Sequence, residues 1–203
     1  MKRQIKLFDP IIDNNELDIL NKTLKSKFWA DGSGNNQVKF FEEKFQKIIK
    51  SDFNIAVNSG TSALYLALSM EDIKDKEVIL PSMTFVSTAH SVITNNAKPV
   101  FADIDLDTLC IDPDKIEEST TKSTKIILPV HFGGLSCDLT KIKKICNTNN
   151  LTLIEDAAHA VGSYYKDKPI GSHGKFVCFS FHPVKNLAMP TGGLISINDK
   201  NFK

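Results

Sequence analysis

Residues 176–186 read Phe176-Val177-Cys178-Phe179-Ser180-Phe181-His182-Pro183-Val184-Lys185-Asn186, an apolar run that leads into a short polar turn. An uncharged run of this kind predicts a strand that is buried on both faces, as in parallel sheets. Lys185 stands five positions after Ser180 and before a second apolar segment that begins at Gly192. Such a lysine is either a turn residue after a buried strand or an amine that forms a Schiff base. Other segments have to decide between these two interpretations.

Similar apolar runs, rich in β-branched residues, recur from residue 55 onward and predict the strands of one sheet. They cover residues 55–57, 77–80, 99–102, 125–130, 151–154, 176–179 and 194–197. Helical patterns lie between them at 61–70, 84–95, 113–119 and 138–148, several with a serine, threonine or aspartate near the start. The alternation predicts an α/β fold with a mainly parallel central sheet and helices on both faces.

The first quarter of the chain has a different pattern. Two amphipathic segments, 14–20 and 38–45, are joined by the turn-rich stretch 29–36. We therefore expect an N-terminal helical arm over residues 1–54, followed by one large domain over residues 55–203. A chain of 203 residues with 41% hydrophobic residues is long enough to bury one sizeable core.

Composition excludes several classes of partner. Lysine and arginine number 25 and aspartate and glutamate number 24, so a net charge of +1 provides no overall electrostatic field that would attract nucleic acid or an anionic membrane.

The four cysteines lack zinc-ligand spacing and the N-terminus leads into no signal-like region, which indicates a cytoplasmic protein. No apolar run approaches the roughly 18 residues that span a bilayer. Arg3 is the only arginine, so a bidentate arginine clamp has to come from Arg3 or from another chain.

The segment 58–64 contains Ser59, Gly60, Thr61 and Ser62 between a predicted strand and a predicted helix. Free backbone N–H groups and the helix dipole make such a place an anion site, and a phosphate would fit there. The segment also fits a plain glycine turn with a serine or threonine cap. It lacks the Walker lysine and the three-glycine dinucleotide spacing.

Two residues that follow the strand at 151–154 are candidates for a site, because ligands of open α/β sheets gather at the carboxyl ends of strands. Asp156 could hold a proton on a heteroaromatic nitrogen as an ion pair, or Glu155 or Asp156 could cap the next turn. His159 could donate to a ring substituent or be a structural histidine.

Four further expectations concern the remaining aromatic, histidine and serine residues. Phe85 could stack on a flat cofactor or pack in the core, and His131 is expected at most in the wall of the cleft. No HxH or HxxxH pair is present, so a metal site is disfavoured. Ser180 lacks the glycine-flanked nucleophile elbow, which argues against a hydrolase.

In their joint order and spacing, these motifs resemble the DegT/DnrJ/StrS family of sugar aminotransferases, which use pyridoxal 5′-phosphate (PLP). The resemblance runs from about residue 12 to residue 197 and rests on segments 59–64, 81–85, 155–160 and 180–186 with Gly192 and Gly193. It implies a PLP-binding large domain of fold type I. It also implies an amino donor, usually glutamate, and a keto group on a nucleotide-linked sugar as acceptor.

The resemblance implies a role for each candidate residue. Lys185 resembles the lysine that forms the Schiff base and then shuttles a proton, and Asp156 resembles the partner of the pyridinium nitrogen. The remaining cofactor-binding residues would be Gly60, Thr61, Ser62 and Ser180 around the phosphate, Phe85 on the ring face and His159 near the phenolic oxygen. A homodimer with shared active sites is implied for the full-length form.

The chain differs from the family pattern in its length, because family members have roughly twice as many residues and include a small C-terminal domain. We therefore expect an N-terminal portion without that domain. Two alternative functions stay open. The chain could be a truncated non-catalytic homologue that acts as a binding or regulatory module, or a nucleotide-binding α/β protein that uses only residues 59–62.

Overall fold

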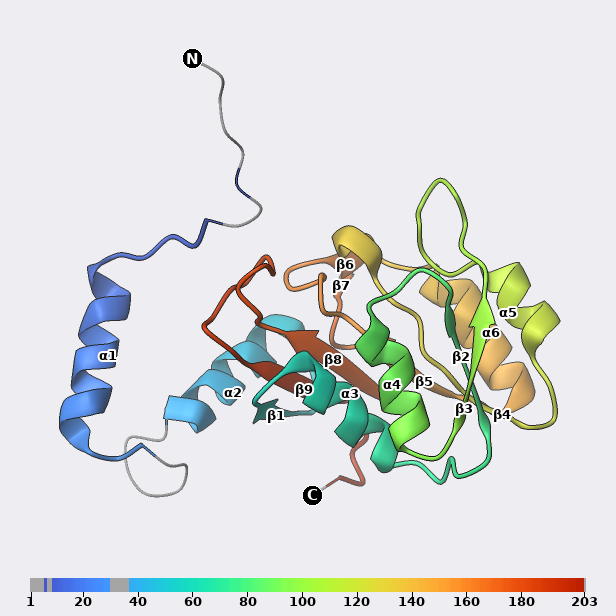
Figure 1. The fold of residues 1–203 in the computed structure, drawn as a ribbon, viewed down its shortest axis with the longest axis horizontal. Coiled ribbons are helices and arrows are strands. Elements are labelled where there is room, and N and C mark those ends of the chain that lie inside the picture. Colours follow the sequence, from blue (N-terminus) through green and yellow to red (C-terminus); the bar gives the residue numbers. More distant parts are fainter. Residues whose placement is uncertain (1–5, 7–8, 30–36, 203) are drawn as a thin grey trace, which may run out of the picture.

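The computed structural model describes residue 6, residues 9–29 and residues 37–202. It contains a seven-stranded sheet in the order β1-β9-β8-β5-β4-β2-β3, flanked by helices (Figure 1). The strands are β1 (Phe53–Val57), β2 (Glu77–Pro81), β3 (Lys98–Ala102), β4 (Thr124–Ile127), β5 (Thr152–Asp156), β8 (Phe176–Ser180) and β9 (Gly193–Ile197). The helices are α1 (Asn14–Ser26), α2 (Gln37–Ile49), α3 (Gly60–Ser69), α4 (Val86–Thr94), α5 (Pro113–Ser119) and α6 (Leu139–Asn149), with a 3₁₀ turn η1 (Phe132–Gly134).

Strand direction confirms a mainly parallel sheet. Strands β3, β2, β4, β5 and β8 pair in parallel, whereas β9 runs antiparallel to both of its neighbours, β8 and β1. The connection from β8 to β9 spans residues 181–192 and contains no helix, so the chain returns beside β8 instead of crossing over. This return loop carries Lys185.

Helices cover both faces of the sheet, as predicted. One core cluster joins the sheet to α3 and α4 through residues such as Leu64, Leu68 and Val92. The other joins it to α2, α5 and α6 through residues such as Ile116 and Ile142. Alternate residues of β2, β4, β5, β8 and β9 therefore face different helices.

Each of the seven predicted strands overlaps an observed one. A short hairpin, β6 (Tyr164–Tyr165) with β7 (Lys168–Pro169), was not predicted, because two-residue strands leave no periodicity to detect. The predicted turn 29–36 lies outside the described residues except for Trp29, and so does Arg3.

The predicted arm contains two helices and the first two residues of β1. Helix α1 begins with a capping box between Asp13 and Glu16, and none of its residues is buried. Helix α2 instead buries Phe45 and Ile49 in the core. The division into domains near residue 54 is a proposal, but α2 already packs with the large domain.

The contribution of α2 is testable on one helix. Phe45 is 3% exposed and its ring lies 5.2 Å from that of Phe179, whereas Phe40 is 53% exposed. Phe45→Ala should lower the free energy of unfolding by about 3–5 kcal/mol, because it leaves a cavity. Phe40→Ala should change it by about 0.5 kcal/mol. Denaturant unfolding measures both, and equal effects would contradict packing of α2 on the sheet.

Candidate active site

A cavity of about 280 Å³ opens at the carboxyl ends of the parallel strands. Seven of the eight predicted site residues line it: Gly60, Thr61, Phe85, Asp156, His159, Ser180 and Lys185. Ser62 is absent from the lining. The other lining residues are Ser59, Leu64, Thr84, Ser87, Val130, Phe132, Ala158, Cys178, His182, Val184, Thr191 and Gly192.

Asp156 is the last residue of β5 and is 5% exposed. Its Oδ2 accepts a hydrogen bond from the Thr88 hydroxyl (2.9 Å), and its Oδ1 accepts one from the Ala158 N–H (3.1 Å). The second bond is the turn cap that the sequence offered as an alternative, so Asp156 both closes the turn and faces the cavity.

Lys185 sits in the return loop between β8 and β9. Its own N–H bonds the His182 carbonyl (2.8 Å), and the next residue, Asn186, donates its side-chain amide to the Val161 carbonyl (2.7 Å). Burial lowers the pKa of the Lys185 amine, while the Asp156 charge opposes the shift. The unprotonated amine, which is the nucleophilic form, is therefore more populated than on an exposed lysine.

The turn into α3 has the geometry of an anion site. Ser59 is the N-cap, and its Oγ accepts from the Ser62 N–H (3.1 Å), so Ser62 fixes the turn from within. Gly60 and Thr61 begin the helix, where amides have no intrahelical acceptor. A Cβ added to Gly60 would lie 2.7 Å from the Ser180 Cβ, so only glycine lets the turn approach β8 this closely.

Phe85 and His159 both line the cavity. Phe85 is the N-cap of α4 and is 72% exposed. The Gly133 N–H donates to His159 Nδ1 (3.2 Å), which assigns the ring proton to Nε2. Burial, and then the positive charge of Lys185, lower the pKa of His159, so the imidazole is neutral and can donate through Nε2.

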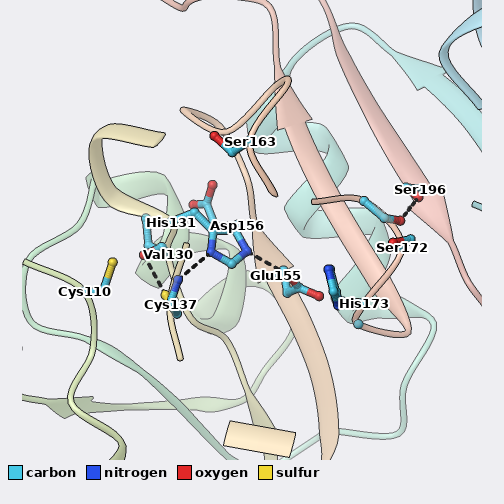
Figure 2. A network of polar contacts seen from close by, with 12 residues as sticks. Cys110, Val130, His131, Cys137, Glu155, Asp156, Ser163, Ser172, His173 and Ser196 are labelled. Atoms are coloured by element: carbon cyan, nitrogen blue, oxygen red, sulfur yellow. Dashed lines mark hydrogen bonds and ion pairs between the residues drawn. The ribbon is translucent and has the colours of Figure 1, made fainter. Parts of the chain in front are cut away.

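His131 does not line the cavity, so it lies outside the cleft wall, which was the nearest position to the site expected for it. It is fully buried, and its Nε2 lies 2.7 Å from Glu155 Oε2, while the Cys137 N–H donates to its Nδ1 (3.1 Å) (Figure 2). Glu155 precedes Asp156 in β5, and successive strand residues point to opposite faces. Asp156 therefore faces the cavity and Glu155 faces the core on the other side.

Thr88 lies next to the site, and the sequence did not single it out. It lies inside α4, is fully buried and donates to Asp156. The signal available was its spacing, one helical turn after Thr84 at the carboxyl end of β2.

Comparison with known proteins identifies the family of this chain. A sequence model of the DegT/DnrJ/EryC1/StrS aminotransferase family matches residues 10–203. The chain belongs to this family. The spore coat polysaccharide biosynthesis protein SpsC of Bacillus subtilis is 43% identical over 194 residues, which are 95% of this chain and 49% of SpsC.

Solved structures of the family share the fold. The PLP form of Spr1654 from Streptococcus pneumoniae, assigned as a sugar aminotransferase, superposes with a TM-score of 0.90 at 30% identity, over 98% of this chain and 54% of that one. DesI, solved in the presence of its TDP-sugar product, superposes with a TM-score of 0.84 at 34% identity, over 93% of this chain and 48% of that one. The chain thus spans about half the length of these family members.

Among the described residues, no group of three or more His, Cys, Asp or Glu side chains is arranged to hold a metal ion. None of the described helices is long and apolar enough to cross a membrane.

The electrostatics of Lys185 give a prediction. Competitive labelling of its amine with acetic anhydride across a pH series should give a midpoint below that of an exposed lysine, because burial disfavours the ammonium form. Asp156→Asn should lower the midpoint further, since the Asp156 charge stabilises that form. A midpoint that rises in Asp156→Asn would contradict the cavity as described.

Proposed function

We propose that this chain binds PLP in the cavity and forms the cofactor-binding part of a nucleotide-sugar aminotransferase. One observation carries the proposal: a buried carboxylate (Asp156), a half-buried amine (Lys185) and an anion-type turn (Gly60, Thr61) line the same cavity. PLP has a chemical group for each of them, namely a basic ring nitrogen, an aldehyde and a phosphate. The residues present therefore fit this cofactor.

The cofactor's charged ends would be held from two sides. The Asp156 carboxylate would pair with the protonated ring nitrogen. The amides of Gly60 and Thr61 would hold the phosphate together with the Ser180 hydroxyl, which accepts from the His182 N–H at 3.4 Å and keeps its hydrogen to donate. Ser62 would act by fixing the turn through Ser59.

The ring itself would be placed by Phe85 and His159. Phe85 offers an exposed aromatic face at the cavity for stacking on a flat ring. His159 would donate its Nε2–H to the phenolic oxygen, because its Nδ1 is occupied by the Gly133 N–H. When bound, PLP supplies an electron sink that stabilises negative charge at the carbon bearing the amine.

Lys185 would have two tasks. Its amine, with a pKa lowered by burial, is the covalent attachment point for the cofactor. As a free amine in the cavity, it would also move a proton to and from the substrate carbon. Asp156 would hold the proton on the ring nitrogen.

The substrate assignment goes further from the site. We propose glutamate as the amino donor and a keto group of a nucleotide-linked sugar as the acceptor, supported by family membership and by the TDP-sugar product of DesI. In the full-length form, a second copy would complete the active site in a cytoplasmic homodimer. The exposed side of Phe85 is consistent with such a partner.

One alternative is a non-catalytic homologue that keeps the cofactor site as a binding or regulatory module. It shares the cavity and differs only in turnover. Glutamate should convert bound PLP to pyridoxamine phosphate if the chain is an aminotransferase portion, and should leave it unchanged if the module is non-catalytic.

Cofactor capture is tested by trapping. The 203-residue chain is mixed with PLP, reduced with borohydride, digested and analysed by mass spectrometry. We expect the modification on Lys185, and its loss in Lys185→Ala. Lys168→Ala, which removes an exposed lysine of β7, is the matched control and should be modified like the unaltered chain. Trapping on a different lysine would sink the assignment.

A further inference from the structure

Hydrogen bonds link three side chains, Thr84, Thr88 and Asp156, between the cavity and the first turn of α4. The Thr84 and Thr88 hydroxyl oxygens lie 2.7 Å apart, and the Thr88 hydroxyl donates to Asp156 Oδ2 at 2.9 Å. Thr84 lines the cavity, whereas Thr88 is fully buried. Thr84 precedes the N-cap Phe85, and Thr88 lies in the first turn of α4, so their contact joins the loop after β2 to the helix start.

The direction of these hydrogen bonds follows from counting protons. A threonine hydroxyl has one hydrogen, and Thr88 gives its hydrogen to Asp156. In the contact between the two threonines, Thr84 must therefore be the donor and Thr88 the acceptor. Thr84 then has only lone pairs to present to the cavity.

These bonds fix the orientation of the Asp156 carboxylate. Oδ2 is held by Thr88 of α4, and Oδ1 by the Ala158 N–H of the turn after β5. With one donor on each oxygen, rotation of the carboxylate would break at least one hydrogen bond to a charged group.

We infer that Thr88 is a positioning residue that sets the plane of the Asp156 carboxylate for a ring nitrogen in the cavity. Because Phe85 directly precedes α4, the same helix start would hold both the nitrogen partner and the ring-stacking side chain. This inference rests on the proposed function, since it assumes that the ligand is PLP. It assigns Thr88 no contact with the ligand itself.

The test pairs a side-chain change with a one-atom change in the ligand. Thr88→Val keeps the shape of the side chain and removes the hydroxyl, and Thr88→Ser keeps the hydroxyl. Binding of PLP is compared with binding of the PLP analogue that has C–H in place of the ring nitrogen. Both ligands fill the same space, so a misshapen cavity weakens both, whereas a misoriented Asp156 weakens PLP selectively.

Thr88→Val should weaken PLP binding about tenfold and leave the analogue within about twofold, because a hydrogen bond to a charged group is worth roughly that factor. Thr88→Ser should bind PLP like the unaltered chain. Thr94→Val removes an exposed threonine hydroxyl from the same helix and should change neither ligand.

Each outcome decides. Equal loss for both ligands in Thr88→Val, or no loss for either, overturns the positioning role while PLP binding stands. Thr88→Ser binding as weakly as Thr88→Val also overturns it. If the unaltered chain takes up neither ligand, the proposed function fails and this inference falls with it.

Discussion

Three backbone segments meet at the carboxyl end of β8, where no room is left for a side chain. A Cβ on Gly193 would collide with the Ser59 carbonyl, and one on Gly60 would collide with Ser180. Gly192, with φ +150°, pairs with Ser59 in a conformation that L side chains rarely adopt. This contact brings the start of α3 and the return loop of β9 together, so the anion turn and Lys185 line one cavity.

Strand β5 provides the other half of the site through simple alternation. Asp156 faces α4 and the cavity, and its neighbour Glu155 is locked on the opposite face against His131. Glu155 Oε1 has no hydrogen-bond partner among the described residues, so this pair is incompletely satisfied. The backbone N–H of His131 also donates to the backbone carbonyl of Asp156, and this bond joins the loop after β4 to β5. A core contact thus supports the backbone beneath a carboxylate that lines the cavity.

Much of the fold was predictable because buried parallel strands leave continuous apolar runs. Periodicity does not report strand pairing, so the antiparallel return of β9 was not predictable, although Gly192 and Gly193 mark the place. For the site, strand ends located Asp156 and Lys185. Thr88 was not singled out because a threonine inside a helix has no local sequence signature. Only the fold brings it to Asp156, which is 68 positions further along the chain. The side on which His131 lies could not be predicted, because a residue after a strand can face either side of the sheet.

We propose that PLP binds in one cavity between Asp156 and Lys185, and a crystal structure of the 203-residue chain with PLP would test this directly. We expect a covalent link from Lys185 Nζ to the cofactor, with the ring nitrogen at hydrogen-bond distance, about 2.7–3.2 Å, from the Asp156 carboxylate. PLP bound elsewhere, or held in the cavity with its nitrogen turned away from Asp156 and Lys185 unmodified, would show that the cavity does not bind the cofactor in this way.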